Sequence, residues 1–183
     1  ITGPDGGTSD FTKHGSGTLT LSGTINVGHN PTLAAIAQVN GGTLRITGTG
    51  SLSADLIQNF STIENSGTIN GPVQTFSSFT STGIINGSLS NFSTAQIQNQ
   101  VNGELANVQN GAIVTLTGTT TGITNYNSAQ GALLDLAGFN TTVGALNGAG
   151  GDIQFGGATL TVDKCSIPFA DYSGAITGPP LFV

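Results

Sequence analysis

The sequence is poor in charge, and above all in positive charge. Lys13, Arg45 and Lys164 are its three cationic residues, and 7% of its 183 residues are charged, against about 25% in an ordinary domain. So few cations cannot neutralise a phosphate backbone, and we therefore expect no nucleic-acid partner.

Cysteine and long apolar runs are also scarce. Cys165 is the single cysteine, so no disulfide can form within the chain. No apolar run approaches the roughly 18 residues of a membrane-spanning helix, and no signal-peptide pattern is visible. The chain begins at Ile1 rather than Met, and we expect it to be a single domain, residues 1–183, excised from a longer protein.

The organising feature is a 16-residue pattern written three times over residues 57–104. The copies are IQNFSTIENSGTINGP, VQTFSSFTSTGIINGS and LSNFSTAQIQNQVNGE, and a degenerate fourth opens at Leu105. A short period with apolar residues in fixed columns is the signature of a solenoid, in which stacked copies bury a continuous core that one copy could not bury alone.

Sixteen residues cannot hold a helix pair with its turns, whereas Val, Ile, Thr and Phe suit short strands and Asn-Gly suits tight corners. The pattern therefore predicts an all-β, parallel β-helix of about ten coils, each adding about 4.8 Å to a rod. We expect the core columns to be the repeated apolar positions: Phe60, Phe76 and Phe92 in one stack, and Ile57, Val73, Leu89 and Leu105 in another.

The third position of the pattern is rich in Asn. Asn59, Asn91 and Asn107 occupy it, Thr75 replaces Asn in the second copy, and we expect Asn125, just ahead of Tyr126, to extend the series. One interpretation is a ladder of side-chain amides running along a corner. The alternative is that these residues are only good turn formers.

Small hydroxylated residues fill the fifth and sixth positions. They form the candidate polar binding face: Ser61, Thr62, Ser77, Ser78, Ser93 and Thr94. Opposed ladders of such groups can exchange many hydrogen bonds, each modest, which add up over length.

No catalytic constellation is evident. Among the acids of the strict repeat, Glu64 lies at position eight and Glu104 at position sixteen, so they do not form the facing carboxylate pair that glycoside hydrolysis needs. The His residues have no Cys or acid at metal-ligand spacing. We expect no catalytic residue, no cofactor and no metal site. A toxin or polysaccharide-acting enzyme is the least favoured class.

Three segments carry a family resemblance. Residues 15–23 read GSGTLTLSG, residues 142–162 read TVGALNGAGGDIQFGGATLTV, and residues 169–178 read FADYSGAITG. Together they resemble the autotransporter-associated β-strand repeat, whose pattern includes GxGTLTLSG, TVGxLxGxGxIxxGxxTLTV and FSGxIxG. The middle of the chain looks like a generic autotransporter passenger.

The resemblance implies a right-handed parallel β-helix on the surface of a Gram-negative bacterium, or secreted from it. It implies adhesion or cell–cell aggregation, with a host surface or matrix molecule as partner, or self-association between cells. Contact with the membrane would be made only through a C-terminal barrel outside this chain. The alternative function is a non-binding spacer that displays a distal domain.

One short sequence recurs at a long interval. Ile1–Pro4 reads ITGP, and the same four letters begin again at Ile176. In the family pattern the chain passes from such an element into the next GxGTLTLSG strand, as it does between Ile1 and Gly23. This favours a module of about 175 residues that could be repeated in tandem.

Overall fold

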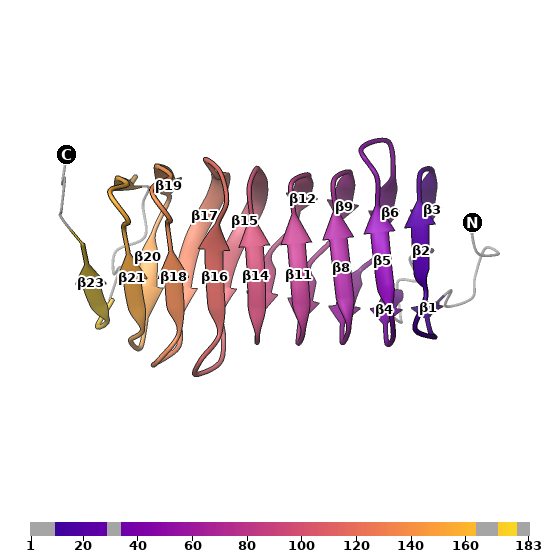
Figure 1. The fold of residues 1–183 in the computed structure, drawn as a ribbon, viewed down its shortest axis with the longest axis horizontal. Helices are drawn as coiled ribbons and strands as arrows, with labels where there is room; N and C mark the ends of the chain where they lie inside the picture. Colours follow the sequence, from indigo (N-terminus) through magenta and orange to yellow (C-terminus); the bar gives the residue numbers. More distant parts are fainter. Residues whose placement is uncertain (1–9, 29–33, 164–171, 179–183) are drawn as a thin grey trace.

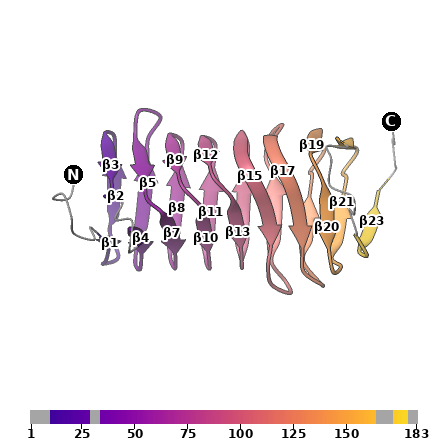
Figure 2. The same ribbon diagram turned by 180° about the vertical axis from the view of Figure 1, so that it is seen from behind.

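The computed structural model describes residues 10–28, 34–163 and 172–178. In these ranges the chain winds into a solenoid of short strands, stacked from β1–β3 at one end to β23 at the other (Figures 1 and 2). Every strand pair formed there is parallel. The predicted all-β, parallel β-solenoid is confirmed. The predictions made for Cys165 and Ile1–Pro4 lie outside the described residues.

The solenoid has three faces, each made by one strand from each coil. The first face contains β1 (Phe11–Lys13), β4 (Ile36–Val39), β7 (Leu56–Asn59), β10 (Val73–Thr75), β13 (Leu89–Asn91) and β20 (Leu146–Gly148). The third face contains β3 (Thr24–Asn26), β6 (Ser51–Ser53), β9 (Thr68–Asn70), β12 (Ile84–Asn86), β19 (Thr141–Val143) and β22 (Leu160–Val162). Two longer strands, β15 (Gln100–Asn107) and β17 (Thr121–Ser128), run from the third face into the first and join both into one 14-stranded sheet.

The second face is a separate nine-stranded sheet with one strand per coil. Its strands are β2 (Thr18–Leu21), β5 (Thr43–Ile46), β8 (Thr62–Asn65), β11 (Ser78–Ser81), β14 (Thr94–Ile97), β16 (Ile113–Leu116), β18 (Leu133–Asp135), β21 (Asp152–Gln154) and β23 (Ala175–Thr177). The described residues therefore form at most nine coils, fewer than the roughly ten expected, because the coils outside the strict repeat are longer than the strict coil.

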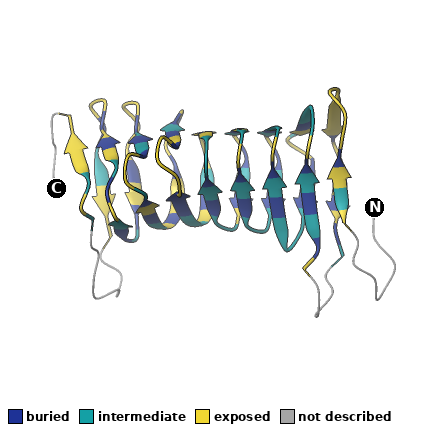
Figure 3. Ribbon diagram, turned by 90° about the horizontal axis from the view of Figure 1, so that it is seen from below, coloured by how far each residue is buried: buried dark blue, intermediate teal, exposed yellow. Residues whose placement is uncertain are grey.

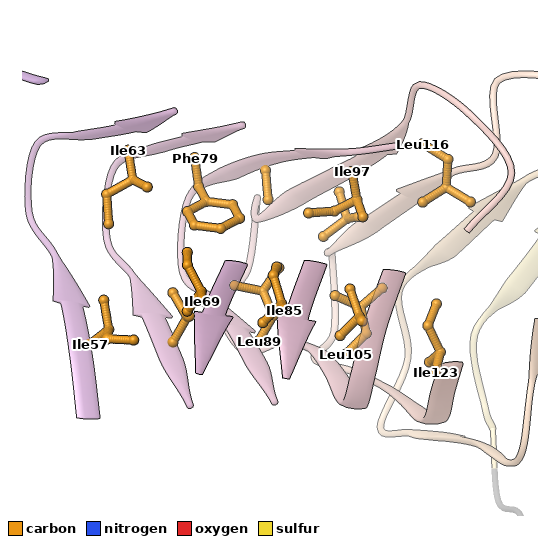
Figure 4. Close-up of a cluster of buried hydrophobic side chains, with 14 of the residues drawn as sticks. Ile57, Ile63, Ile69, Phe79, Ile85, Leu89, Ile97, Leu105, Leu116 and Ile123 are labelled. Atoms are coloured by element: carbon orange, nitrogen blue, oxygen red, sulfur yellow. The ribbon is translucent and has the colours of Figure 1, made fainter. Parts of the chain in front are cut away.

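The sequence pattern sets the register. On the first face Val73 is paired with Ile57 on one side and with Leu89 on the other, and Leu89 is paired with Leu105, so partners occupy the same position of successive repeats. These four side chains are buried, as are Ile69, Ile85 and Val101 on the third face. Figure 4 shows the aliphatic side chains of the three faces pointing toward one another inside the solenoid.

Alternation along each strand decides which side chains enter this core. In β8 the pattern runs from half-buried Thr62 to buried Ile63, then half-buried Glu64 and buried Asn65, as expected when successive side chains point to opposite faces of a sheet. Ile63, Phe79 and Val114 continue one buried column along the second face. Figure 3 shows this mixture of buried and exposed positions along the rod.

Strand β4 begins at Ile36, soon after the described residues resume at position 34. The described residues contain no helix that is long and apolar enough to cross a membrane.

Candidate functional site

The candidate site lies at the corner between the first and second faces. In the three strict coils this corner is two residues long, because β7 ends at Asn59 and β8 begins at Thr62, and the next coils repeat that spacing. We call its six residues the aromatic corner: Phe60, Ser61, Phe76, Ser77, Phe92 and Ser93.

The three Phe rings stack along the outside of the rod. The ring centroids of Phe60 and Phe76 are 4.9 Å apart with planes 5° from parallel, and those of Phe76 and Phe92 are 4.5 Å apart at 19°. The side chains of Phe60 and Phe76 are 46% and 38% exposed, and Phe92 is half-buried. Because the rings cover one another's faces, their edges form the surface offered to solvent.

This placement corrects the prediction that Phe60, Phe76 and Phe92 form a core column. The stacking expected from the period is present, but on the outer side of the sheet. The reason is strand alternation: Ile57 and Asn59 both point inward, so Phe60, the next residue after Asn59, points outward. The core aromatic of the strict repeat is instead Phe79, which is 1% exposed.

Backbone hydrogen bonds hold each ring above the one before. The Phe76 N–H donates to the Asn59 carbonyl and the Phe92 N–H donates to the Thr75 carbonyl, both at 2.8 Å. The next coil adds Val108 through a bond to the Asn91 carbonyl at 2.9 Å, and its side chain is 42% exposed. The aromatic corner is thus extended by an exposed aliphatic residue.

A buried polar column supports the corner from inside. Asn59 Nδ2 donates to Thr75 Oγ1 at 3.0 Å and to the Ser78 carbonyl at 2.7 Å, while its Oδ1 accepts the Ser61 N–H at 3.1 Å. Since the amide can donate and accept at once, one side chain links two coils and closes its own turn.

The same arrangement recurs two coils later. Asn91 Nδ2 donates to Asn107 Oδ1 at 2.8 Å, and its Oδ1 accepts the Ser93 N–H at 3.2 Å. Asn107 Nδ2 then reaches the Tyr126 hydroxyl at 3.2 Å. Burial raises the pKa of the Tyr126 phenol, and its hydrogen bonds with Ser128 and Asn107 offset part of that rise. In the described residues no buried side-chain nitrogen or oxygen lacks a hydrogen-bond partner.

Asn125 is not part of this column, which corrects the predicted extension of the ladder. The register pairs Asn107 with Ser128, whereas Asn125 pairs with Glu104. Asn125 Nδ2 donates to Glu104 Oε1 at 3.3 Å, and Asn147 Nδ2 donates to Asn125 Oδ1 at 2.6 Å. The shift arises because the coil from Asn107 to Ser128 is longer than the strict coil from Asn91 to Asn107.

The hydroxyl residues of the candidate polar face lie beside the Phe stack in two columns. Ser61, Ser77 and Ser93 are half-buried at the corner, and the Ser61 hydroxyl donates to the Gly42 carbonyl at 2.8 Å. Ser78 opens β11 and pairs in register with Thr62 on one side and Thr94 on the other. Ser78 and Thr94 are exposed and Thr62 is half-buried.

The sequence pattern also contains two ladders that were not predicted. Gln58 on the first face accepts from Gln38 at 2.8 Å and donates to Gln74 at 3.2 Å. On the third face, Asn86 donates to Asn70 and accepts from Asn102, both at 2.8 Å. The sequence does contain the pattern that predicts the third-face ladder, because Asn70, Asn86 and Asn102 recur once per repeat in the Asn-Gly pairs.

Charge is sparse around the aromatic corner, and none of its six residues is ionisable. The second face carries an exposed ion pair, in which Arg45 Nε lies 2.7 Å from Glu64 Oε2. Across the described ranges, no group of three or more His, Cys, Asp and Glu residues is arranged to hold a metal ion. The corner can therefore offer aromatic edges, hydroxyl groups and backbone to a partner, without a strong field of either sign.

Comparison with known proteins identifies an adhesin among the relatives of this chain. The Adhesin BmaC autotransporter of Brucella suis biovar 1 (strain 1330) is 45% identical over 65 residues, which is 34% of this chain and 2% of that protein. The chain therefore spans only a small part of the relative. No protein-family model matches the chain, and no solved structure matches it. The homologue is an autotransporter adhesin and the chain folds as a β-solenoid, as expected of an autotransporter passenger with repeats.

Proposed function

We propose that this chain is a segment of a surface-exposed autotransporter passenger that acts in adhesion or cell–cell aggregation, and that the aromatic corner is its contact surface. The partner is a host surface or matrix molecule, or the same protein on another cell. The setting is the surface of a Gram-negative bacterium or its secreted fraction. In this proposal the segment is not an enzyme.

The exposed Phe stack is the observation that carries the proposal. Large apolar side chains are normally buried, yet Phe60 and Phe76 lie outside a solenoid that has a well-packed interior. Aromatic residues are enriched in protein interfaces, where they supply much of the binding energy. Similarity to an autotransporter adhesin over part of the chain supports the same class of function.

The regular spacing suits a partner that is engaged at several points. Each of the three strict coils presents one aromatic edge and two hydroxyl groups, so one coil offers only a weak contact. Repetition along the rod multiplies weak contacts, because each contact after the first forms within an already tethered pair. This explains how a surface with little charge could hold a cell.

The test is to display the chain on a non-adherent bacterium and measure attachment to matrix-coated plates and aggregation in suspension. Replacing Phe60, Phe76 and Phe92 together with Ser should reduce attachment or aggregation at least tenfold. The matched control replaces the third-face ladder, Asn70, Asn86 and Asn102, with Ser. This control variant should attach or aggregate as the unmodified chain does. If the Phe variant adheres as well as the parent, the aromatic corner is not the contact surface.

The spacer remains the second candidate, favoured by the recurrence of ITGP at Ile1 and Ile176, since spacers lengthen by duplication. The same assay distinguishes a spacer from an adhesin. A parent chain that shows neither attachment nor aggregation supports the spacer and overturns the adhesion proposal.

A further inference from the structure

Six Asn residues of the described chain are followed directly by Gly, and this dipeptide is prone to lose its side-chain amide spontaneously. The pairs are Asn40-Gly41, Asn70-Gly71, Asn86-Gly87, Asn102-Gly103, Asn110-Gly111 and Asn147-Gly148. The backbone nitrogen that follows Asn can attack the side-chain carbonyl carbon, and Gly hinders this attack least because it has no Cβ. In a folded protein the rate depends on how firmly the side-chain amide and the backbone of the pair are held.

Hydrogen bonds restrain five of these six Asn side chains. The restrained residues are Asn70, Asn86 and Asn102 in the third-face ladder, Asn147, which donates to Asn125 at 2.6 Å, and Asn40, which donates to Gln38 at 3.4 Å. Asn110 is the exception, because its exposed side-chain amide makes no hydrogen bond within the described residues. The amide of Asn110 is therefore free to rotate into the geometry that the attack requires.

The backbone of the two kinds of pair differs in the same direction. A Cβ on Gly71, in the ladder, would overlap the Ala54 carbonyl oxygen of the preceding coil, whereas a Cβ on Gly111 would meet nothing within 4 Å. Both glycine N–H groups donate to a carbonyl of the next coil at 3.0 Å, so this bond does not distinguish them. The peptide before Gly111 can therefore rotate without displacing a neighbouring coil, whereas the peptide before Gly71 is packed between coils.

Asn110 lies at the end of the aromatic corner. Strand β15 ends at Asn107 and β16 begins at Ile113, so the loop between them is longer than the two-residue corners of the strict coils (Figure 1). This loop opens with Val108, the exposed residue that continues the Phe column, and Asn110 and Gly111 form its turn. Because none of the six residues of the aromatic corner is ionisable, a charge at this position would be new to the surface.

We propose that Asn110 is a site of spontaneous deamidation in the folded protein, and that the reaction adds a negative charge beside the aromatic corner. The Gly111 nitrogen loses its proton and forms a bond to Asn110 Cγ, the Cγ–Nδ2 bond breaks, and ammonia leaves behind a cyclic imide. Water then opens the imide at either of its carbonyl groups, so the products are aspartate and isoaspartate. The net change converts an amide and water into a carboxylate and ammonium, with water as the only co-reactant.

The new carboxylate weakens attachment as the protein ages. Contact through the Phe edges and Val108 removes water from this surface, and a charge that loses its water without gaining a partner costs free energy. This effect on attachment rests on the proposed function, whereas the deamidation of Asn110 does not.

The reaction is tested by ageing the folded chain in mildly alkaline buffer and measuring aspartate and isoaspartate at each Asn-Gly pair by peptide mass spectrometry. Asn110 should convert at least about tenfold faster than Asn70, Asn86 and Asn102, because the ladder residues react only after local opening. In urea the differences among these pairs should largely disappear, since every pair is then equally flexible. Equal rates in the folded chain, or no conversion at Asn110, would overturn the proposal.

The effect of the charge is tested by attachment of the displayed chain. Asn110→Gln is the matched control, because Gln130 occupies the equivalent position in the next coil and a Gln side chain closes the cyclic imide far more slowly. Asn110→Gln should attach as the parent does and keep that attachment on ageing, whereas fresh Asn110→Asp and the aged parent should both attach several-fold less.

The two readouts separate the possible failures. If the parent does not attach at all, the proposed function fails, and mass spectrometry still decides whether Asn110 deamidates. If the parent attaches and Asn110→Asp attaches equally well, the weakening of attachment by the new charge is overturned. Far-UV circular dichroism checks that both variants keep the strand content of the parent.

Discussion

The strict coils, residues 57–104, and the coils that follow them share the same three-faced architecture. They differ in how regularly their side chains stack from one coil to the next. In the strict coils every paired column advances by exactly one repeat, so equivalent side chains lie directly above one another. Beyond them the steps along the second face lengthen, first from Ala95 to Val114 and again from Val114 to Leu134. The apolar core continues without interruption, whereas the Phe stack and the Asn column do not.

The difference shows that the apolar core and the side-chain ladders have different structural requirements. A hydrophobic core needs an apolar residue facing inward in each coil, and Ala95, Val114 and Leu134 serve equally well because apolar burial is non-directional. Ring stacks and amide ladders need matched geometry, since hydrogen bonds and aromatic pairs are directional. Extra residues at a corner therefore remove ladders before they disturb the core.

The largest contrast is expected between two Phe residues in the same coil. Phe79→Ala should reduce the free energy of unfolding by about 3–5 kcal/mol, as for a buried aromatic. Phe76→Ala should cost only about 1–2 kcal/mol, because it loses two outer ring contacts rather than core packing. Urea unfolding followed by circular dichroism measures both free energies. Equal losses would contradict the placement of Phe79 in the core and of Phe76 on the outer surface.

A second contrast concerns glycines from the two regions. A Cβ on Gly83 would overlap the Gly67 carbonyl oxygen, inside the regular stack of coils, whereas a Cβ on Gly111 would meet nothing within 4 Å. Gly83→Ala should therefore cost about 3 kcal/mol or more through displaced backbone. Gly111→Ala, at a φ of +79°, should cost about 1–2 kcal/mol from its left-handed conformation alone. The midpoints of thermal unfolding should rank the two variants in this order, and the reverse order would show that the coils can shift apart.

The buried Asn column should be sensitive to loss of a single amide. Asn91→Ala leaves the Ser93 N–H and the Ile113 carbonyl without the partners they have in the parent, so we expect a loss of about 1–3 kcal/mol. Asn125→Ala, on the outer side, should cost less than about 1 kcal/mol. If urea unfolding gives similar losses of unfolding free energy for the two variants, Asn125 supports the fold as strongly as Asn91 does.

The smallest expected effect is an alkaline one. Burial, with the nearby Tyr126 and Asp152, raises the pKa of Tyr172 from 10.0 to about 12. The unfolded chain therefore loses this proton first, so the contribution of Tyr172 to stability is complete below pH 10 and disappears as the pH rises toward 12. Urea midpoints at pH 9 and pH 12 should differ less in Tyr172→Phe than in the parent. An unchanged difference would show that this proton is not linked to folding.

Much of the fold follows from the sequence, and the parts that did not follow have identifiable causes. The 16-residue period and its Asn-Gly pairs predicted the solenoid, the stack of Ile57, Val73 and Leu89, and the corner at Asn70-Gly71 between the third and first faces. Repetition of an apolar residue at position four predicts that Phe60 lies in the core, but counting alternate residues from Ile57 places it outside. Asn125 was assigned from proximity along the chain, and its column could not be predicted because corner insertions reset the register.

The direction of the hydrogen bonds has a mechanical consequence. Parallel strands of successive coils bond to each other along the rod axis, so a pull on its ends acts on the inter-coil interfaces in series, and these can separate one at a time. Each strict coil adds about 4.8 Å to the rod but holds about 50 Å of extended chain, at about 3.3 Å for each of its residues. Under tension the rod can thus lengthen roughly tenfold in separate steps, dissipating work at each step while the remaining coils stay folded.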